Sequence, residues 1–432
     1  NSEWTCFCGD SKNEYYCYSE IACQDTLYSE HSWKATNCCD VTGADNYQWS
    51  YETILGQECS QVFWSEYCVG GFNLFFCRSC TSCSDCFGCT NLRQKKFCFL
   101  NEQLTEEEYR ARMKEIDLKD ANVVAYWQKR INDEVWSKAP RRASGNRQSD
   151  FCDGDDMVNC QHTVGTSVAE CERCENIYFN VLLKDSMDCT MSSESEWCIS
   201  SQELIRSYQI RFSAYIDSCI DLEYCELMKS CEHCFGCIGL ERKKFCIFNK
   251  QYTEEEYWKL VDQIKTTMLA GGEYGQFFPY ETNVVAYNVS HAQNLFPLTA
   301  EQAVQKGLRW YGFGEESKVE MRSIEDLPVH LDRFTDDLLK QVYRCPASGR
   351  PLRVVKDELE FHRRFGLALP RLQPTARRKA RMGRLLGLRY YPATCVRCQI
   401  KTTTRILPDA QTPLLCEVCY EEYMSNDEGL KR

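Results

Sequence analysis

Four cysteines near the end of the chain have the residue type and spacing of a metal site. Two residues separate Cys395 from Cys398, two separate Cys416 from Cys419, and 17 residues lie between the pairs. Each Cys-x2-Cys turn directs two thiolates at one ion, and four thiolates suit tetrahedral Zn²⁺. Because these ligands leave no open coordination position, we expect a structural zinc ribbon with Zn²⁺ as the only cofactor.

The other thiols are concentrated in the first 250 residues, which hold 26 of the 31 cysteines. Their x2 spacing is compatible with zinc or iron–sulfur ligands, and their density is compatible with disulfides. We favour small apolar fillers stacked inside a β-solenoid, because Met228 stands where the first run has Cys80. Nine thiols could belong either to a weaker metal site or to such a core ladder. They are Cys77, Cys80, Cys83, Cys86, Cys89, Cys225, Cys231, Cys234 and Cys237.

The chain contains a tandem duplication. TSCSDCFGCTNLRQKKFCFLNEQLTEEEY, which starts at residue 81, matches KSCEHCFGCIGLERKKFCIFNKQYTEEEY without gaps at an offset of 148 residues. We expect a mainly β fold with peripheral helices, in which two cysteine-rich β-solenoid repeats precede a small α+β segment that ends in the zinc ribbon. The expected units are residues 1–138, 150–314 and 318–432, with a linker between the repeats.

Helices are expected at the end of each repeat. Thr105 and Thr253 are each followed by three glutamates, which is the pattern of a capping box. It predicts helices over 106–117 and 254–269, with Tyr109 and Tyr257 packed against the last coil. Further helices are expected near 300–307, 324–343, 358–365 and 377–386.

Charge divides the chain unevenly. Residues 341–405 carry 16 Lys and Arg against three Asp and Glu, a net charge of +13, so the rest of the chain carries −25. Such a segment suits a polyanionic partner such as nucleic acid, or the acidic body of the protein itself. The expected phosphate contacts are Arg377, Arg378, Lys379, Arg381, Arg384 and Arg389.

Several runs together resemble a known group of proteins. They are CFGCIGLERKKFCIFNKQYTEEEY, FFPYETNVVAYN, FPLTAEQAVQKGLRW and ELEFHRRFGLALPRL with CEVCY. They are similar to an uncharacterised family of cysteine-rich zinc-ribbon proteins from candidate-phyla bacteria of the Parcubacteria kind. The resemblance covers nearly the whole chain and implies a further zinc-binding module before Asn1. It also implies partner thiols for Cys345, and because this chain lacks them we expect no metal there.

These patterns favour a non-enzymatic protein. The six histidines are scattered without an HExxH pair. We expect an acidic solenoid body that binds protein partners or its own assembly, and a basic tail, residues 341–405, that binds nucleic acid or another anion. The alternatives are a structural subunit of a ribonucleoprotein, filament or virion, and a thiol-redox or metal-binding protein. No apolar run reaches 18 residues, so we expect no membrane contact. We predict no small-molecule substrate. We favour a reducing cytoplasm, with a secreted or particle-associated location as the alternative.

Overall fold

A computed structural model describes most of the second half of the chain and part of the first. The described residues are 27–28, 39, 50–51, 56–57, 60–63, 68–144, 153–158, 164–172, 178–184, 190–196, 202–280, 285–290, 292–312, 319–384, 390–407 and 412–431. They combine many strands with many helices, so helices have a larger share than the expected mainly β fold.

The first sheet lies in the first sequence copy, and we call it ladder one. Its strands pair in parallel except for the last two, and the register advances by 12 residues, as in Ser84 with Lys96. Its strands are β1 (Ser50–Tyr51), β2 (Gly56–Gln57), β3 (Ser60–Phe63), β4 (Cys68–Phe75), β5 (Arg78–Phe87), β6 (Thr90–Arg93), β7 (Lys96–Phe99) and β8 (Glu102–Gln103).

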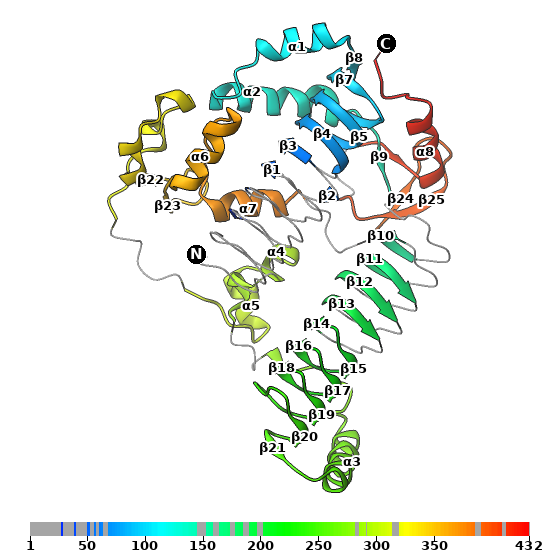
Figure 1. Cartoon of the computed structure of the whole chain (residues 1–432). Coiled ribbons are helices and arrows are strands. Elements are labelled where there is room, and N and C mark those ends of the chain that lie inside the picture. Colours follow the sequence, from blue (N-terminus) through cyan, green and yellow to red (C-terminus); the bar gives the residue numbers. More distant parts are fainter. Residues whose placement is uncertain are drawn as a thin grey trace.

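The second sheet, ladder two, has the same construction over more strands. Tyr208 pairs with Ile220, Ile220 with Glu232, and Glu232 with Lys244, each 12 residues on. Its strands are β10 (Asp153–Val158), β11 (Val164–Glu172), β12 (Tyr178–Lys184), β13 (Thr190–Glu196), β14 (Gln202–Ile205), β15 (Tyr208–Arg211), β16 (Ala214–Asp217), β17 (Ile220–Glu223), β18 (Glu226–Lys229), β19 (Glu232–Phe235), β20 (Lys244–Ile247) and β21 (Lys250–Gln251). Its last strands and α3 (Glu254–Gly271) form the narrow end of the molecule (Figure 1).

Both ladders turn at every third residue. Successive residues such as Ser79, Ser82 and Asp85 have φ between 51° and 54°, which is uncommon outside glycine. The residue that follows each of these three is buried, as Cys80, Cys83 and Cys86 show, whereas Lys95 and Lys243 at two later turns are not buried. This period of three residues places the cysteines inside the ladders, where they pack against one another and against aliphatic side chains.

The inward residues alternate between two kinds of position. At every sixth residue, here called a corner, the side chain accepts the backbone N–H of the residue 12 positions ahead. Cys219 Sγ accepts from Cys231 at 3.2 Å, and Ser213 Oγ accepts from Cys225 at 2.9 Å. Every corner that makes this bond is a small Cys or Ser with an acceptor atom. The corners with such a bond are Cys83, Cys89, Ser207, Ser213, Cys219, Cys225, Cys231 and Cys237.

The positions between corners, here called centres, need only apolar volume. They hold Leu, Ile, Met or Cys, and among the described side chains all are buried except Leu240, which is half-buried. Met228 can therefore replace Cys80 at the same place in the repeat. The only bond lost is the long one from Cys80 Sγ to the carbonyl of Arg78 at 3.6 Å, and no backbone N–H loses its acceptor. The buried centres are Leu74, Cys80, Cys86, Leu92, Cys98, Ile210, Ile216, Leu222, Met228, Cys234 and Cys246.

The capping boxes predicted at the end of both repeats are confirmed. Thr105 and Thr253 each accept the N–H of a glutamate three residues on, and that glutamate accepts the threonine N–H. The helices are α1 (Glu106–Lys114), shorter than predicted, and α3, which is slightly longer. Tyr109 and Tyr257 are buried, with ring centroids 5.9 Å from Phe97 and 5.7 Å from Phe245, as predicted.

After α1 the first copy continues into a second helix. This helix is α2 (Ala121–Ile131), and it is followed by the π-helical turn η1 (Asn132–Trp136) and the short strand β9 (Arg141–Arg142). After α3 come η3 (Tyr287–Val289), α4 (Ala292–Leu295) and α5 (Ala300–Gln305), and the capping box of α5 at Thr299 agrees with the predicted helix start. None of the described helices is long and apolar enough to cross a membrane.

The helix predicted over 324–343 is wrong. That stretch forms three short 3₁₀ turns, and Arg371 from a distant segment donates to the carbonyls of Ile324 and Leu327 that a helix would use. The turns are η4 (Ile324–Asp326), η5 (Leu331–Arg333) and η6 (Asp336–Lys340). The remaining elements are β22 (Tyr343–Arg344), β23 (Pro351–Leu352), α6 (Lys356–Phe365), α7 (Pro374–Met382), β24 (Tyr391–Thr394), β25 (Lys401–Thr404), β26 (Leu414–Leu415) and α8 (Glu417–Ser425).

Candidate metal centre

The four predicted zinc ligands come together at one point. Cys395 and Cys398 lie in the turn that joins β24 to β25, Cys416 precedes α8, and Cys419 lies in its first turn. Their four Sγ atoms all lie within 4.8 Å of one another, and 3.6 Å separates those of Cys398 and Cys416. Among the residues that the structure describes, no other group of three or more Cys, His, Asp or Glu is this compact.

Backbone hydrogen bonds shape the first thiol turn. Cys395 donates its N–H to the carbonyl of Ile400 at 3.0 Å, and Gln399 donates to the carbonyl of Cys395 at 3.0 Å. Gln399 adopts a φ of 61°, so the chain reverses sharply behind the two thiols. Local backbone bonding therefore holds the turn in shape, as a Cys-x2-Cys pair requires for binding one ion.

The electrostatics of the turn favour a thiolate. Burial raises the pKa of Cys395, but backbone N–H groups of Cys398, Cys416 and Arg397 outweigh it and lower that pKa to about 6. Burial and the neighbouring thiols raise the pKa of Cys419 to about 12, because several negative sulfurs repel one another. A divalent cation would relieve this repulsion, since it binds sulfur as thiolate.

The donor set fits a metal ion by type and by spacing. Zinc bound tetrahedrally at about 2.3 Å from each sulfur places the sulfurs roughly 3.8 Å apart. The observed sulfur cluster is close to that size. Four thiols without a carboxylate or imidazole favour a soft, four-coordinate metal such as zinc over calcium or magnesium.

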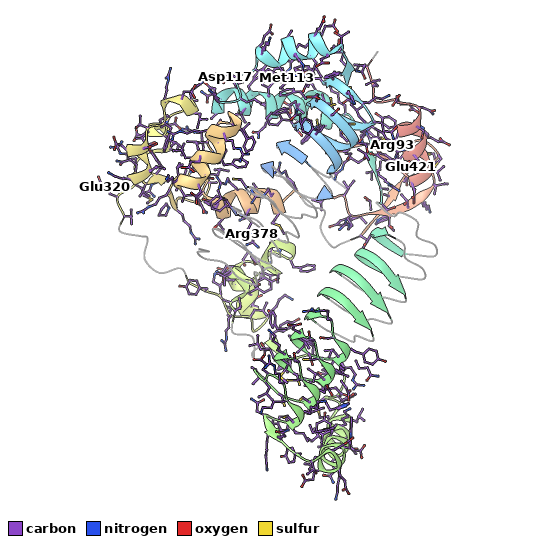
Figure 2. All side chains as sticks on the ribbon, viewed as in Figure 1. Arg93, Met113, Asp117, Glu320, Arg378 and Glu421 are labelled. Atoms are coloured by element: carbon purple, nitrogen blue, oxygen red, sulfur yellow. The ribbon has the colours of Figure 1, made fainter. Side chains whose placement is uncertain are left out.

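The ribbon that carries these thiols is fastened to ladder one. Its strand β26 pairs in parallel with β9, which lies after the first repeat. Arg93 of β6 pairs with Glu421 of α8 at 2.9 Å, and the two side chains meet at the edge of the ladder (Figure 2). The hydroxyl of Tyr420 donates to Asn91 at 3.0 Å in a buried contact. The helix that presents Cys419 therefore also covers one face of ladder one.

Two arginines of the basic segment, residues 341–405, are buried and do not form part of the predicted phosphate-binding surface. Arg377 and Arg381 are only 2% and 1% exposed, so these two predicted contacts are wrong. Arg377 pairs with the equally buried Glu358 of α6 at 2.8 Å, and its guanidinium lies 4.8 Å from the ring centre of Tyr28. Burial and the charge of Arg377 lower the pKa of His362 to about 3, so this imidazole is neutral.

The other predicted phosphate contacts remain nearer the surface. Lys379 and Arg384 are exposed and Arg378 is half-buried, whereas Arg389 lies outside the described residues. The amphipathic pattern of α7 does place basic residues on both of its faces. Sequence reasoning missed the buried face because its acidic partner, Glu358, comes from a different helix.

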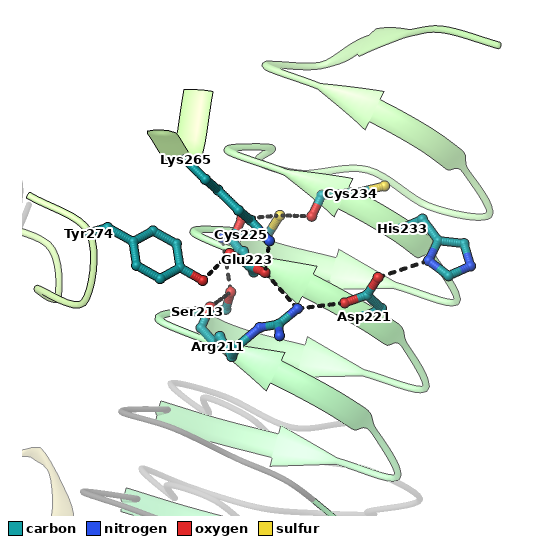
Figure 3. A network of polar contacts seen from close by, with 9 residues as sticks. All are labelled: Arg211, Ser213, Asp221, Glu223, Cys225, His233, Cys234, Lys265 and Tyr274. Atoms are coloured by element: carbon teal, nitrogen blue, oxygen red, sulfur yellow. Dashed lines mark hydrogen bonds and ion pairs between the residues drawn. The ribbon is translucent and has the colours of Figure 1, made fainter. Parts of the chain in front are cut away.

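A polar network that sequence reasoning did not single out joins ladder two to α3. Glu223 is 3% exposed and contacts Lys265 Nζ, with the Tyr274 hydroxyl donating to it at 3.0 Å (Figure 3). Arg211 bridges Glu223 and Asp221. Burial and the Glu223 charge raise the pKa of Tyr274 to about 12. Each charged group here has an opposite partner, so the network holds α3 against the sheet and offers no open reactive group.

The cysteines of the ladders lie in the core, with their Sγ atoms bonded to backbone. All nine that could have been either metal ligands or core residues are buried, at no more than 1% exposure. Cys89 Sγ, for example, donates to the carbonyl of Cys98 at 3.4 Å and accepts the N–H of Asn101 at 3.4 Å. These nine cysteines are free thiols.

Cys345 lies in a turn of the same type, but among the described residues it does not belong to the compact thiol group. Its backbone bonds to Arg350 and Gly349 match those of Cys395. Its sulfur instead accepts the N–H of Gln373, the residue that caps α7.

No protein-family model matches the chain, and no curated protein matches it.

Proposed function

We propose that the chain is a non-enzymatic structural and interaction protein, in which zinc fastens the C-terminal ribbon onto a β-solenoid body. The observation that carries this proposal is the double role of α8. One end of the helix presents Cys419 beside the other three thiols, and the same helix contacts β6 and β9 through Glu421, Tyr420 and Glu417. A metal that orders this helix therefore also orders an internal interface.

The parallel ladders are the proposed solenoid body. Their 12-residue register and buried inward residues support this description. Thiols used as core packing and backbone acceptors need no metal and no disulfide, which favours a reducing location. An outer surface that varies while the interior repeats suits a scaffold for protein partners.

The test is a metal count on the intact purified chain. We expect one zinc per chain by inductively coupled plasma mass spectrometry, and its loss in Cys416→Ser. The matched control is Cys345→Ser, which removes a buried thiol from the same type of turn and should leave zinc content unchanged. Several metals per chain would instead favour a metal-binding role for the ladder thiols. The absence of zinc from both the purified wild-type chain and Cys345→Ser would refute the proposal.

Nucleic acid is a second candidate partner, favoured by the exposure of Lys379 on α7 and of Arg384 just after that helix. Phosphate contacts would weaken with salt, because bound counterions are released. RNA binding by the full chain should therefore fall between low and moderate salt, and fall further in the Lys379→Glu, Arg384→Glu double variant. Equal binding by that variant would exclude α7 and the turn after it as the contact.

A further inference from the structure

The two ladders present the same outer face to different surroundings. At the 148-residue offset, Thr90, Arg93, Lys95 and Asn101 of ladder one correspond to Ile238, Glu241, Lys243 and Asn249 of ladder two. The backbone is equivalent at these places. The Asn101 side chain bonds the N–H and carbonyl of Thr90, and the Asn249 side chain bonds those of Ile238 in the same way. We call the ladder two residues 238–250 the tip face.

In ladder one this face is covered by residues 417–431 of the same chain. Lys95 pairs with Asp427 at 2.6 Å, in addition to the Arg93–Glu421 pair. Leu430 packs against the buried thiols of the ladder. The backbone of Lys431 pairs in parallel with Glu102 and donates to the carbonyl of Asn101, so the chain end adds one more rung to the sheet. The cover is thus an acidic helix followed by a short extended segment.

In ladder two the same face is open to solvent. Ile238 is 52% exposed, whereas Thr90 at the equivalent place is fully buried. Phe248 and Leu227 nearby are 66% and 54% exposed. Among the described residues, no strand adds a rung beside Lys250, where Lys431 does so in ladder one. An open sheet edge flanked by exposed apolar side chains is a surface for strand addition.

The charge of the tip face indicates the partner. Lys243 is the counterpart of Lys95 and is exposed, and Lys250 adds a second exposed positive charge. Arg242 and Lys244 are also exposed, but they pair with Glu241 and Glu232. Only Glu241, which replaces Arg93, has the opposite sign within residues 241–250. A segment that suits this face would be acidic opposite Lys243, apolar opposite Ile238, and neutral or basic opposite Glu241.

We propose that the tip face of ladder two binds an acidic segment of a partner protein, in the way that residues 417–431 cover ladder one. The segment would place a carboxylate on Lys243 and add a backbone rung beside Asn249 and Lys250. This inference rests on the proposed interaction role of the solenoid body. It does not depend on the metal, because the ribbon contacts the other ladder.

The test uses the zinc-loaded full chain and a labelled peptide with the sequence of residues 420–431, YEEYMSNDEGLK, as the probe. Fluorescence anisotropy should show saturable binding. Lys243→Glu should weaken it about threefold or more, the effect expected for one exposed ion pair turned repulsive. A peptide with Glu421→Arg should bind about threefold tighter, because Glu241 replaces Arg93. Lys259→Glu, on an exposed position of α3, is the matched control and should leave binding unchanged.

Four results would overturn the inference. The first three are the absence of peptide binding, binding that Lys243→Glu leaves unchanged, and loss of binding only in Lys95→Glu, which would place the peptide on ladder one. A fourth is that RNA, and not the peptide, binds in a way that depends on Lys243. If the chain holds one zinc and any of these results is found, only the proposed binding at the tip face is rejected. If the chain holds no zinc, only the metal part of the proposed function is rejected.

Discussion

Ladder one and ladder two share an interior but differ in what lies on the outside. One outward column of ladder one is aromatic, with Phe75, Phe87 and Phe99 in register. The same column of ladder two begins with the ion pair of Arg211 and Glu223 before it becomes apolar. The period of three residues determines the coil, and the outward residues are free to differ because the backbone does not depend on them.

Each column packs against a different part of the chain. The aromatic column lies against Trp127 of α2, whose ring meets Phe87 edge-on at 5.2 Å between centroids. The charged column lies against Lys265 of α3 and against Tyr274, both of which contact Glu223. Equivalent sheets therefore hold their helices by apolar contact in one case, and by apolar contact together with a buried ion cluster in the other.

Metal removal should separate the two ladders most strongly. Chelation, or Cys419→Ser, is expected to release α8 from β6 and β9, because the thiols no longer hold the start of that helix. Hydrogen exchange followed by mass spectrometry should show a large loss of protection over 90–102 and 141–142. Ladder two over 208–247 serves as the internal control, and equal loss there would contradict a local role for the ribbon.

The aromatic column should be the next most sensitive feature. Phe87→Ala removes a fully buried ring that stacks on Phe99 at 5.0 Å between centroids. We expect a loss of about 3–5 kcal/mol in the free energy of unfolding. Phe235→Ala, at the equivalent place in ladder two, should cost less, because its neighbour Phe248 is 66% exposed. Denaturant unfolding of both variants measures the difference, and a larger cost for Phe235→Ala would reverse the comparison.

The charged column should respond to loss of one carboxylate. Glu223→Gln leaves Arg211 and Lys265 beside a neutral amide in a partly desolvated site, and we expect a loss of roughly 2 kcal/mol. Protection of α3 against hydrogen exchange should fall with it. Asp217→Asn, which removes a more exposed partner of Arg206, is the control and should change stability little. An unchanged α3 in Glu223→Gln would show that apolar packing alone holds the helix.

The smallest effect should distinguish corners from centres inside a ladder. Cys231→Ser keeps an acceptor for the N–H of Lys243, as Ser213 does for Cys225, so stability should change by about 0.5 kcal/mol or less. Cys234→Ser puts a hydroxyl at an apolar centre and should cost about 1 kcal/mol or more. Thermal unfolding of the two variants tests this order. A greater cost at the corner would show that the thiol there has a role beyond backbone bonding.

Local patterns in the sequence were sufficient for several features. The Cys-x2-Cys spacing predicts the turn at Cys395, because two thiols that close together bind one ion only when the chain reverses between them. The capping boxes at Thr105 and Thr253 involve four consecutive residues each, so they are equally readable. The cysteine spacing also indicated inward-pointing residues, although their division into corners and centres requires the backbone hydrogen bonds.

Other features depended on residues far apart in the chain. The short turns over 324–340 form because Arg371 bonds carbonyls there, and the burial of Arg377 follows from its contact with Glu358 on another helix. The amino-acid pattern of α7 is the same whether its arginines meet phosphate or a buried carboxylate. Sequence alone therefore determined the thiol cluster, the repeat and the helix starts, since these rest on neighbours in the chain. Only the tertiary structure decided that the ribbon covers ladder one and leaves the tip face of ladder two exposed, because that outcome depends on which distant surfaces meet.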